Sequence, residues 1–242
     1  MDSFEHNGFL NIFKPVGMTS HDVVSYVKRR IHAHKVGHGG TLDPAACGVL
    51  VILINKGAKL SDRVMHGRKH YRFEMTFGLQ TDTGDVQGNL LKSDTVIIPE
   101  SDITGVLSRF VGEIQQMPPM ASAIKINGRR LYKSAHKGET VERPPRNVTI
   151  HELHLVDSHV RNGRTAALLD MQCSRGTYVR SLVEDVAAAL GAQATTTFLM
   201  RSASGPFHAH AAVPLQKITP ETARHFLLAP EFLDGASDPV LY

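Results

Sequence analysis

The most constraining feature of the sequence is an aliphatic run at residues 49–54, which directly follows a glycine-rich loop. Residues 37–54 read GHGGTLDPAACGVLVILI. An apolar run of this length without polar alternation predicts a strand that is buried on both faces of a sheet. Asp43 lies at the mouth of that strand, and a carboxylate beside desolvated backbone is costly unless it is paired. We therefore ask what chemistry this carboxylate serves.

Composition narrows the class of protein. The chain has 242 residues, of which 42% are hydrophobic and 21% charged, as in ordinary globular proteins. Its first residues lack the basic start and apolar run of a signal peptide, and no apolar stretch approaches membrane-spanning length. Cys47 and Cys173 form no disulfide framework or zinc-finger spacing. We expect a cytoplasmic protein with no membrane association.

Charge and histidine content bear on partners and metals. A net charge of +4 is compatible with a polyanionic partner but is weak evidence alone. Fourteen histidines suggest a metal, yet the pairs at 32/34 and 208/210 lack a third ligand at useful spacing. The loop at 37–40 is not a dinucleotide fingerprint, and the sequence contains no phosphate-binding GxxxxGK[ST] motif. We expect neither a metal nor a cofactor.

Strand and helix signals alternate along the chain, which predicts an α+β protein with helices packed against a sheet. Helical periodicity and capping residues predict helices starting at 19–20, over 58–65, 103–110 and 177–190, and starting at 219–220. Strand patterns lie at 49–54, 69–77, 147–157, 165–173 and 195–201, with a bulge expected near Glu152. We expect one domain over residues 1–242.

A basic segment at residues 115–146 stands apart, because it is rich in proline, glycine and cations and poor in aliphatic periodicity. It is either a solvated loop or an excursion that grips RNA phosphates and stacks on bases. The cations that we expect to contact an RNA backbone are Lys125, Arg129, Arg130 and Lys133.

Three side chains are candidates for chemistry. An aspartate before proline usually caps its own turn, but Asp43 also has a rigid strand behind it and glycines that permit close approach. Such a carboxylate can act as nucleophile or base if a cation keeps it ionised. Arg180, in the first turn of a predicted helix, is the best candidate for that cation. Tyr71 is either a core tyrosine or a ring that stacks on a planar base.

Five stretches occur in an order that resembles the tRNA pseudouridine-55 synthases of the TruB type. They are NIFKPVGMTSHDVV at 11–24, GHGGTLDPAACGVLVI at 37–52, KHYRFEMTFGLQTDTGDVQG at 69–88, CSRGTYVRSLVEDV at 173–186 and FLMRSASGPF at 198–207. The resemblance implies the pseudouridine synthase catalytic fold, a mixed and mainly antiparallel central sheet flanked by helices. It also implies isomerisation of uridine 55 in the tRNA T-loop, by flipping the base out and without a cofactor.

The resemblance also implies roles for individual residues. Asp43 matches the catalytic aspartate, Arg180 the arginine that pairs with it, and Tyr71 the tyrosine that stacks on the target base. The positions that match contacts to the flipped-out uridine and its surroundings are His38, Tyr178 and Leu199. Lys14 matches a motif that supports the active-site loop, and the basic segment an insertion that closes over the T-arm. Asp43 can attack C1′, abstract the 2′ proton or attack C6 of the base, and the sequence does not choose among these steps.

The same resemblance bears on the binding partners of the protein and on two alternative functions. The sequence ends at Tyr242 without room for the PUA-type domain that many members carry, so we expect a monomer that binds the tRNA T-arm without a protein partner. One rival is a non-catalytic RNA-binding or RNA-folding module of the same fold. Another is a guide-RNA-dependent relative of the dyskerin type, which relies on a PUA domain and partners. The presence of Asp43, Tyr71 and Arg180 favours the enzyme.

Overall fold

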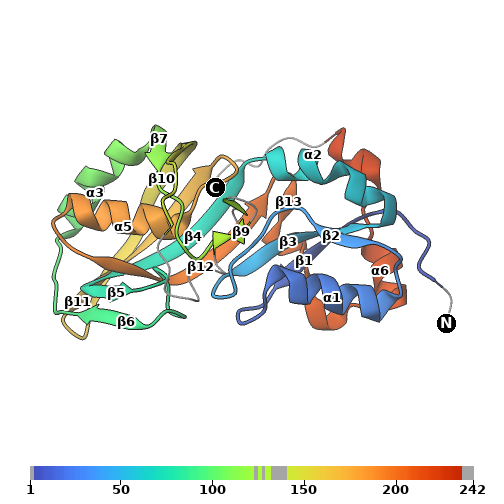
Figure 1. The fold of residues 1–242 in the computed structure, drawn as a ribbon, viewed down its shortest axis with the longest axis horizontal. Coiled ribbons are helices and arrows are strands. Elements are labelled where there is room, and N and C mark those ends of the chain that lie inside the picture. The colour runs from blue at the N-terminus through green and yellow to red at the C-terminus, as the bar shows by residue number, and fades with distance from the viewer. Residues whose placement is uncertain (1–2, 123–124, 127–128, 132–140, 236–242) are drawn as a thin grey trace. The chain divides into compact units, whose positions relative to one another are not determined.

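The computed structural model describes residues 3–122, 125–126, 129–131 and 141–235. The chain forms two compact units (Figure 1): unit 1 contains Met1–Tyr71 and Met200–Tyr242, and unit 2 contains Arg72–Leu199. Strands β4 (Lys69–Phe77) and β12 (Ala194–Ser204) each contribute residues to both units. The expectation of one catalytic domain concerns how the units act together and stays a prediction.

Unit 1 is built on β3, which has β1 on one edge and β2 and the end of β12 on the other. Its β1–β3 and β2–β3 pairs are antiparallel, whereas β1–β14 and β3–β12 are parallel. Its elements are β1 (Gly8–Lys14), α1 (Ser20–Ile31), β2 (Val36–His38), β3 (Cys47–Ile54), η1 (Asn55–Leu60), α2 (Ser61–His66), β13 (Phe207–His208), η3 (Ala209–Ala211), β14 (Val213–Pro214), η4 (Leu215–Lys217), α6 (Pro220–Phe226) and η5 (Pro230–Leu233).

Burial of β3 on both faces is confirmed, because all eight of its residues are buried. Leu50, Ile52 and Ile54 enter a core beneath α1 and α6, while the alternate residues Val49 and Val51 enter a second core beneath α2. Figure 1 shows α1 and α6 along one side of these strands and α2 along the other. Helices on both faces explain why β3 carries no polar alternation.

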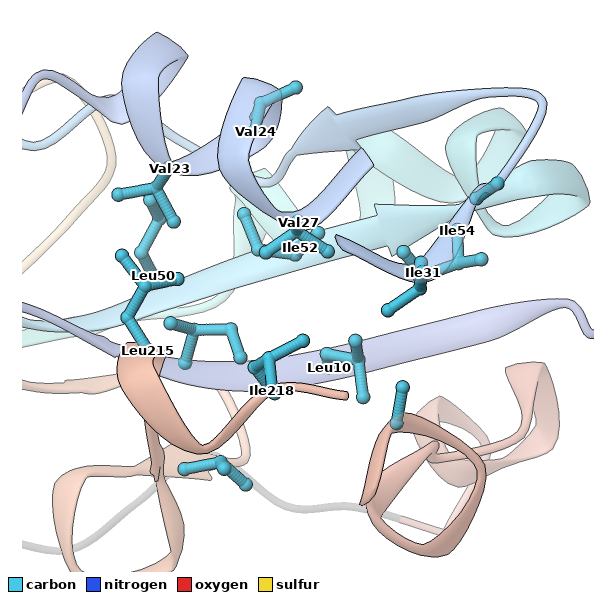
Figure 2. Close-up of a cluster of buried hydrophobic side chains, with 14 of the residues drawn as sticks. Leu10, Val23, Val24, Val27, Ile31, Leu50, Ile52, Ile54, Leu215 and Ile218 are labelled. Carbon is cyan, nitrogen blue, oxygen red and sulfur yellow. The ribbon is translucent and has the colours of Figure 1, made fainter. Parts of the chain in front are cut away.

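Helix α1 begins where the sequence predicts. Thr19 is its N-cap and forms a capping box with Asp22: the Thr19 Oγ1 accepts from the Asp22 amide at 3.1 Å, and Asp22 Oδ2 accepts from the Thr19 amide at 2.8 Å. Figure 2 shows the apolar side of α1 lying over Leu50 and Ile52 of β3 and Leu10 of β1. This packing places α1 against β1 and β3.

Unit 2 has the strand order β12-β4-β11-β10-β7, and its β10–β11 and β10–β7 pairs are antiparallel. Helix α3 contacts both β10 and α5. Besides its parts of β4 and β12, its elements are β5 (Leu79–Thr81), β6 (Leu90–Ser93), α3 (Glu100–Leu107), η2 (Ser108–Phe110), β7 (Gly112–Gln116), β8 (Lys125–Ile126), β9 (Arg129–Arg130), β10 (Arg146–Arg161), β11 (Arg164–Cys173) and α5 (Val179–Ala189). The predicted α+β class with a mixed, mainly antiparallel sheet is confirmed.

Most predicted elements are present, including the bulge, since the β10–β11 register shifts between Ile150 and Glu152. The predicted helix at 58–65 is instead a 3-10 turn followed by the short helix α2. The alternation predicted for β4 fails at its start, where His70 is buried together with Lys69. Lys69 turns inward because its Nζ donates to the carbonyls of Met65 at 2.8 Å and Gly67 at 2.5 Å, at the end of α2.

Neither unit contains, within its described residues, a helix long and apolar enough to cross a bilayer.

The start of β3 supplies a stability prediction. Gly48 has φ +105°, and a Cβ there would lie 2.3 Å from the Arg201 carbonyl oxygen. We expect Gly48→Ala to lower the free energy of unfolding by about 2 kcal/mol or more, measured by urea titration, because strained backbone and overlap add. Gly37→Ala is the control, since no atom lies within 4 Å of its added Cβ. Equal losses in the two variants would contradict this account of β3.

Candidate active site

Asp43 is half-buried in a turn immediately before β3. The turn is closed by the Ala46 amide, which donates to the Asp43 carbonyl at 3.0 Å. Pro44 disfavours helical geometry at Asp43, because the proline ring clashes with a helical residue before it. The carboxylate is therefore carried by a short turn anchored to a fully buried strand.

Arg201 holds the loop that leads to Asp43. Its side chain is 2% exposed, and its three nitrogen groups donate to three carbonyls: Nη2 to Gly40 at 3.2 Å, Nη1 to Thr41 at 3.1 Å and Nε to Val49 at 2.8 Å. One guanidinium thus joins the loop to β3. A planar donor with five N–H groups is suited to this, because several carbonyls can be satisfied at once.

Ser20 and Lys14 hold the next part of the same loop. Ser20 Oγ accepts from the Leu42 amide at 2.8 Å and donates to the Leu42 carbonyl at 3.0 Å. Lys14 Nζ donates to the carbonyls of Met18 at 2.6 Å, Pro15 at 2.8 Å and Pro44 at 3.5 Å. Through these contacts Lys14 holds the loop, which is the kind of support that the resemblance implies for it.

The five consecutive carbonyls of residues 40–44 therefore all accept hydrogen bonds. Those of residues 40 and 41 accept from Arg201, that of Leu42 from Ser20, that of Asp43 from Ala46, and that of Pro44 from the Gly17 amide at 2.8 Å as well as from Lys14. A loop whose main chain is satisfied in this way has little freedom to move. The geometry fixes the Cα of Asp43 before any substrate binds.

Two residues close to Asp43 in the sequence, His38 and Cys47, have shifted pKa values. Burial, helped by the positive charge of Arg201, lowers the pKa of His38, so the ring is neutral near pH 7. Its Nδ1 accepts from the Gly40 amide at 3.3 Å, which places the proton on Nε2. Burial raises the pKa of Cys47, so its thiol stays protonated and is a poor nucleophile at neutral pH.

Tyr71 is the last residue of unit 1 on β4 and is half-buried. It continues the alternation of the buried residues Phe73, Met75 and Phe77 and so lies on the apolar face of β4. Its role against a base stays a prediction.

Arg180 lies in the first turn of α5, as predicted, and is 3% exposed. Its Nη1 donates to the Thr83 carbonyl at 2.7 Å, its Nη2 to the Ala121 carbonyl at 2.9 Å, and its Nε lies 3.8 Å from Asp85 Oδ2. Asp85 is itself buried and accepts from Thr83 Oγ1 at 2.8 Å. The pairing of Arg180 with Asp43 stays a prediction.

Of the other substrate-contacting candidates of unit 2, Leu199 lies on the predicted strand, whereas Tyr178 lies just before its predicted helix. Tyr178 is the N-cap of α5, so the helix predicted from 177 begins at Val179. Its amide and carbonyl both bond to the side chain of Gln116. Leu199 lies on β12 and is 7% exposed.

The basic segment is only partly described. Residues 115 and 116 belong to β7 and Arg146 begins β10, so both ends of the predicted insertion are sheet strands. Between them, β8 and β9 form a hairpin that pairs Lys125 with Arg130 and Ile126 with Arg129. Lys133 lies outside the described residues, and contact between this segment and RNA stays a prediction.

Tyr178 and Arg180 lie together at the start of α5, as predicted. The loop predicted at 37–40 begins later, because His38 is the last residue of β2 and pairs with Ile52 of β3. The sequence predicts no role for the buried polar residues that hold these elements, namely Ser20, Arg201, Asp85 and Gln116. Ser20, Arg201 and Asp85 lie inside the five stretches that resemble the TruB type, so their positions in the sequence could have marked them as candidates. Gln116 lies in none of these stretches.

Across the part of the chain that the structure describes, no three or more His, Cys, Asp or Glu side chains are grouped so as to hold a metal ion. The expectation of metal-independent activity stays a prediction.

The buried ammonium of Lys14 predicts a pH dependence of stability. Burial lowers the pKa of Lys14 to about 8 from its ordinary value of 10.5, although the charges of Cys47 and Asp43 oppose the shift. Between these pH values the unfolded chain binds a proton that the folded chain has lost, so stability rises with pH. We expect the unfolding free energy of the wild type to rise relative to Lys14→Met by at most about 3 kcal/mol across this window.

Urea titrations of both proteins at several pH values measure this difference. Below about pH 8 it should be constant, because Lys14 is protonated in both states. A difference that does not change between pH 8 and 10.5 would contradict the assignment.

Comparisons with known proteins show the family of the chain. The model of the family described as TruB family pseudouridylate synthase (N terminal domain) matches residues 28–179. tRNA pseudouridine synthase B of Alkaliphilus oremlandii is 42% identical over 212 residues, which cover 88% of this chain and 70% of that protein. The protein of the same name from Symbiobacterium thermophilum is 44% identical over 222 residues, covering 91% of this chain and 74% of that protein.

Solved structures show the same fold. A chain in the crystal structure of a Cbf5-Nop10-Gar1 complex is 28% identical with a TM-score of 0.68, and the match covers 89% of this chain and 54% of that one. A chain in an H/ACA RNP bound to a substrate RNA containing 2′-deoxyuridine is 24% identical with a TM-score of 0.69, covering 93% of this chain and 60% of that one. The sequence similarity over most of the chain and the family model together show that this chain belongs to the TruB family of pseudouridylate synthases.

Proposed function

We propose that the protein is a tRNA pseudouridine synthase that isomerises uridine 55 in the T-loop of tRNA, with Asp43 as its essential carboxylate. The observation that carries the proposal is the rigid mounting of Asp43, on a loop whose five consecutive carbonyls all accept hydrogen bonds. The relatives that are more than 40% identical are named tRNA pseudouridine synthase B, which supports tRNA as the substrate.

The reaction is an isomerisation. The N1–C1′ glycosidic bond breaks, the uracil turns, and C5 bonds to C1′ while the C5 proton is released and N1 gains a proton. Asp43 attacks C1′, removes the 2′ proton or attacks C6, and each alternative needs its carboxylate ionised and aimed within reach of one atom. Fixed positioning of reacting groups removes much of the entropic barrier, which is the benefit of a loop held by Arg201, Ser20 and Lys14.

We assign the remaining contacts from the sequence resemblance. Arg180 pairs with Asp43 and fixes the direction of its carboxylate, because a guanidinium can donate two parallel hydrogen bonds to a carboxylate. Tyr71 stacks on the extruded base, and neutral His38, Tyr178 and Leu199 contact the flipped-out nucleotide and its surroundings. Extraction of a base costs a few kcal/mol, less from a loop than from a duplex, which favours the T-loop as target.

In the cell, the enzyme acts in the cytoplasm as a monomer on the T-arm of tRNA. It needs no protein partner, guide RNA, metal or other cofactor. The pure protein in EDTA, given an unmodified tRNA transcript alone, should therefore form pseudouridine. Activity that needs zinc or an added protein would contradict this part.

Substitution of Asp43 separates chemistry from folding and binding. We expect Asp43→Asn to bind tRNA with the wild-type Kd, because the amide preserves the shape of the side chain and the loop is held through its main chain. Its single-turnover rate should fall by at least about four orders of magnitude, since neither a nucleophile nor a base remains. Release of tritium from [5-³H]uridine tRNA measures that rate.

A folding control accompanies this experiment. The urea midpoint of Asp43→Asn should match that of the wild type, so that loss of turnover is not loss of structure. Pseudouridine formation by Asp43→Asn within tenfold of the wild-type rate would contradict the assignment. A wild type that binds the T-arm but never converts it would instead support the non-catalytic RNA-binding module.

The basic segment provides a second test of the proposal. Replacing Arg129, Arg130 and Lys133 with glutamine should weaken tRNA binding and flatten the plot of log affinity against log salt by somewhat under about three units in all. The single-turnover rate at saturating tRNA should change little, because phosphate contacts position the substrate without joining in bond breaking. Filter binding over a salt series measures the slope.

The matched control removes the same charge elsewhere in unit 2. It replaces three exposed cations with glutamine, namely Lys92, Arg109 and Arg161. Its salt slope should stay near that of the wild type. Equal slopes in the wild type and the first variant would show that the basic segment is not the RNA grip.

A further inference from the structure

The residues immediately before the β8–β9 hairpin contact the start of α5. Gln116, the last residue of β7, is 1% exposed. Both polar atoms of its side chain bond to the backbone of Tyr178. Its Nε2 donates to the Tyr178 carbonyl at 3.0 Å, and its Oε1 accepts from the Tyr178 amide at 2.7 Å. A buried primary amide is thus paired with a single residue of the helix cap.

Two further bonds join the same segments. Ser181 Oγ donates to the Met117 carbonyl at 2.8 Å, and Arg180 Nη2 donates to the Ala121 carbonyl at 2.9 Å. Both donor side chains are at most 5% exposed. Residues 116–121 therefore bond to three of the first four residues at the start of α5, counted from its N-cap.

Gln116 satisfies the backbone N–H of the N-cap residue of α5. In a capping box that N–H is bonded by a Glu or Gln side chain at the third helical residue, which in α5 is Ser181, whose Oγ donates to the Met117 carbonyl instead. Gln116 Oε1 takes this role from another strand, and pairing of β7 with β10 holds the backbone of Gln116 (its partner is Arg146). The backbone of Tyr178 is therefore tied to β7 through one side chain.

We propose that Gln116 is a positioning residue for catalysis, which sets the backbone of Tyr178 and with it the direction of the Tyr178 ring and the Arg180 guanidinium. The inference rests on the proposed function, in which Tyr178 contacts the flipped-out nucleotide and Arg180 pairs with Asp43. A shift of about 1 Å in such groups slows a reaction by up to about a hundredfold. Gln116 itself does not touch the reacting atoms.

Gln116→Met tests the proposal, since methionine is close to glutamine in size and shape but makes neither bond. At saturating tRNA we expect its single-turnover rate constant to fall by about 10- to 100-fold, while the Kd for tRNA changes less than about threefold. The rate constant is the informative quantity. Partial unfolding lowers the amplitude of a single turnover and leaves the rate constant of the folded fraction unchanged.

Thr165→Val is the matched control. Thr165, 2% exposed on β11 of the same unit, also bonds through one side chain to one residue's backbone: its Oγ1 accepts from the Ile98 amide at 2.9 Å and donates to the Ile98 carbonyl at 3.2 Å. We expect this variant to lose comparable stability and to keep the wild-type rate constant. If Thr165→Val and Gln116→Met slow the reaction equally, Gln116 has only a structural role and the proposal fails.

A second variant keeps the test valid if Gln116→Met folds poorly. In Gln116→Glu, the carboxylate accepts from the Tyr178 amide but repels its carbonyl, and protonation restores a donor. The ratio of its rate constant to that of the wild type should therefore rise as the pH falls. A ratio independent of pH would contradict the role of the donor bond.

Hydrogen exchange provides a readout that does not depend on activity. The amides of residues 178–182 should exchange at least about tenfold faster in Gln116→Met than in the wild type and be unchanged in Thr165→Val. If wild-type protein forms no pseudouridine, the proposed function fails while this measurement still tests the bond. Unchanged exchange in Gln116→Met would overturn the inference whatever the activity.

Discussion

Hydrogen bonding of the carbonyls of residues 40–44 is the constraint on which the proposed site depends. Residues 40–44 belong to no helix or strand, so their main-chain polar groups need partners from side chains or from other segments. Arg201, Ser20 and Lys14 supply donors from β12, α1 and β1, of which β12 is far from the loop in the sequence. The position of Asp43 is consequently a property of the folded core of unit 1.

Two of these donors are buried cations, which is unusual in a core. Transfer of a charge out of water is costly unless it is well hydrogen-bonded, and Lys14 and Arg201 are each 2% exposed or less. Each meets three carbonyls, and charge-assisted bonds of this kind are stronger than neutral ones. Unit 2 uses a neutral counterpart, because the Gln116 amide holds the backbone of Tyr178. In both units, buried polar side chains fix the main chain of residues proposed to meet the substrate.

Much of the fold could be predicted from the sequence wherever burial of one face gives the apolar residues a regular spacing. The unbroken run of β3, the alternation of β4 beyond Tyr71 and the helical stripe of α1 each reflect a face packed on a core. The start of β4 could not, because Lys69 is buried by carbonyls at the end of α2 and not by periodicity. The helix at 177 begins two residues late for a related reason, since Tyr178 is held in extended geometry as the cap.

Some residues of the candidate site could likewise be predicted from the sequence and others could not. Asp43, Tyr71 and Arg180 were identifiable because their residue types and neighbours are chemically distinctive. The partners of Arg180 at Thr83, Asp85 and Ala121 were not, because they come from loops 59 to 97 residues away in sequence and only folding brings them together. Gln116 has no local signal at all, as a glutamine at a strand end is ordinary until its burial and both bonds are seen.

The most direct test of the account is the position of pseudouridine in the product. An unmodified tRNA transcript, incubated with the pure protein in EDTA, is mapped for pseudouridine at single-nucleotide resolution along its whole length. The account predicts one new pseudouridine, at uridine 55 of the T-loop, at near-stoichiometric yield. Conversion at other uridines in place of position 55, or no conversion although the tRNA is bound, would contradict it.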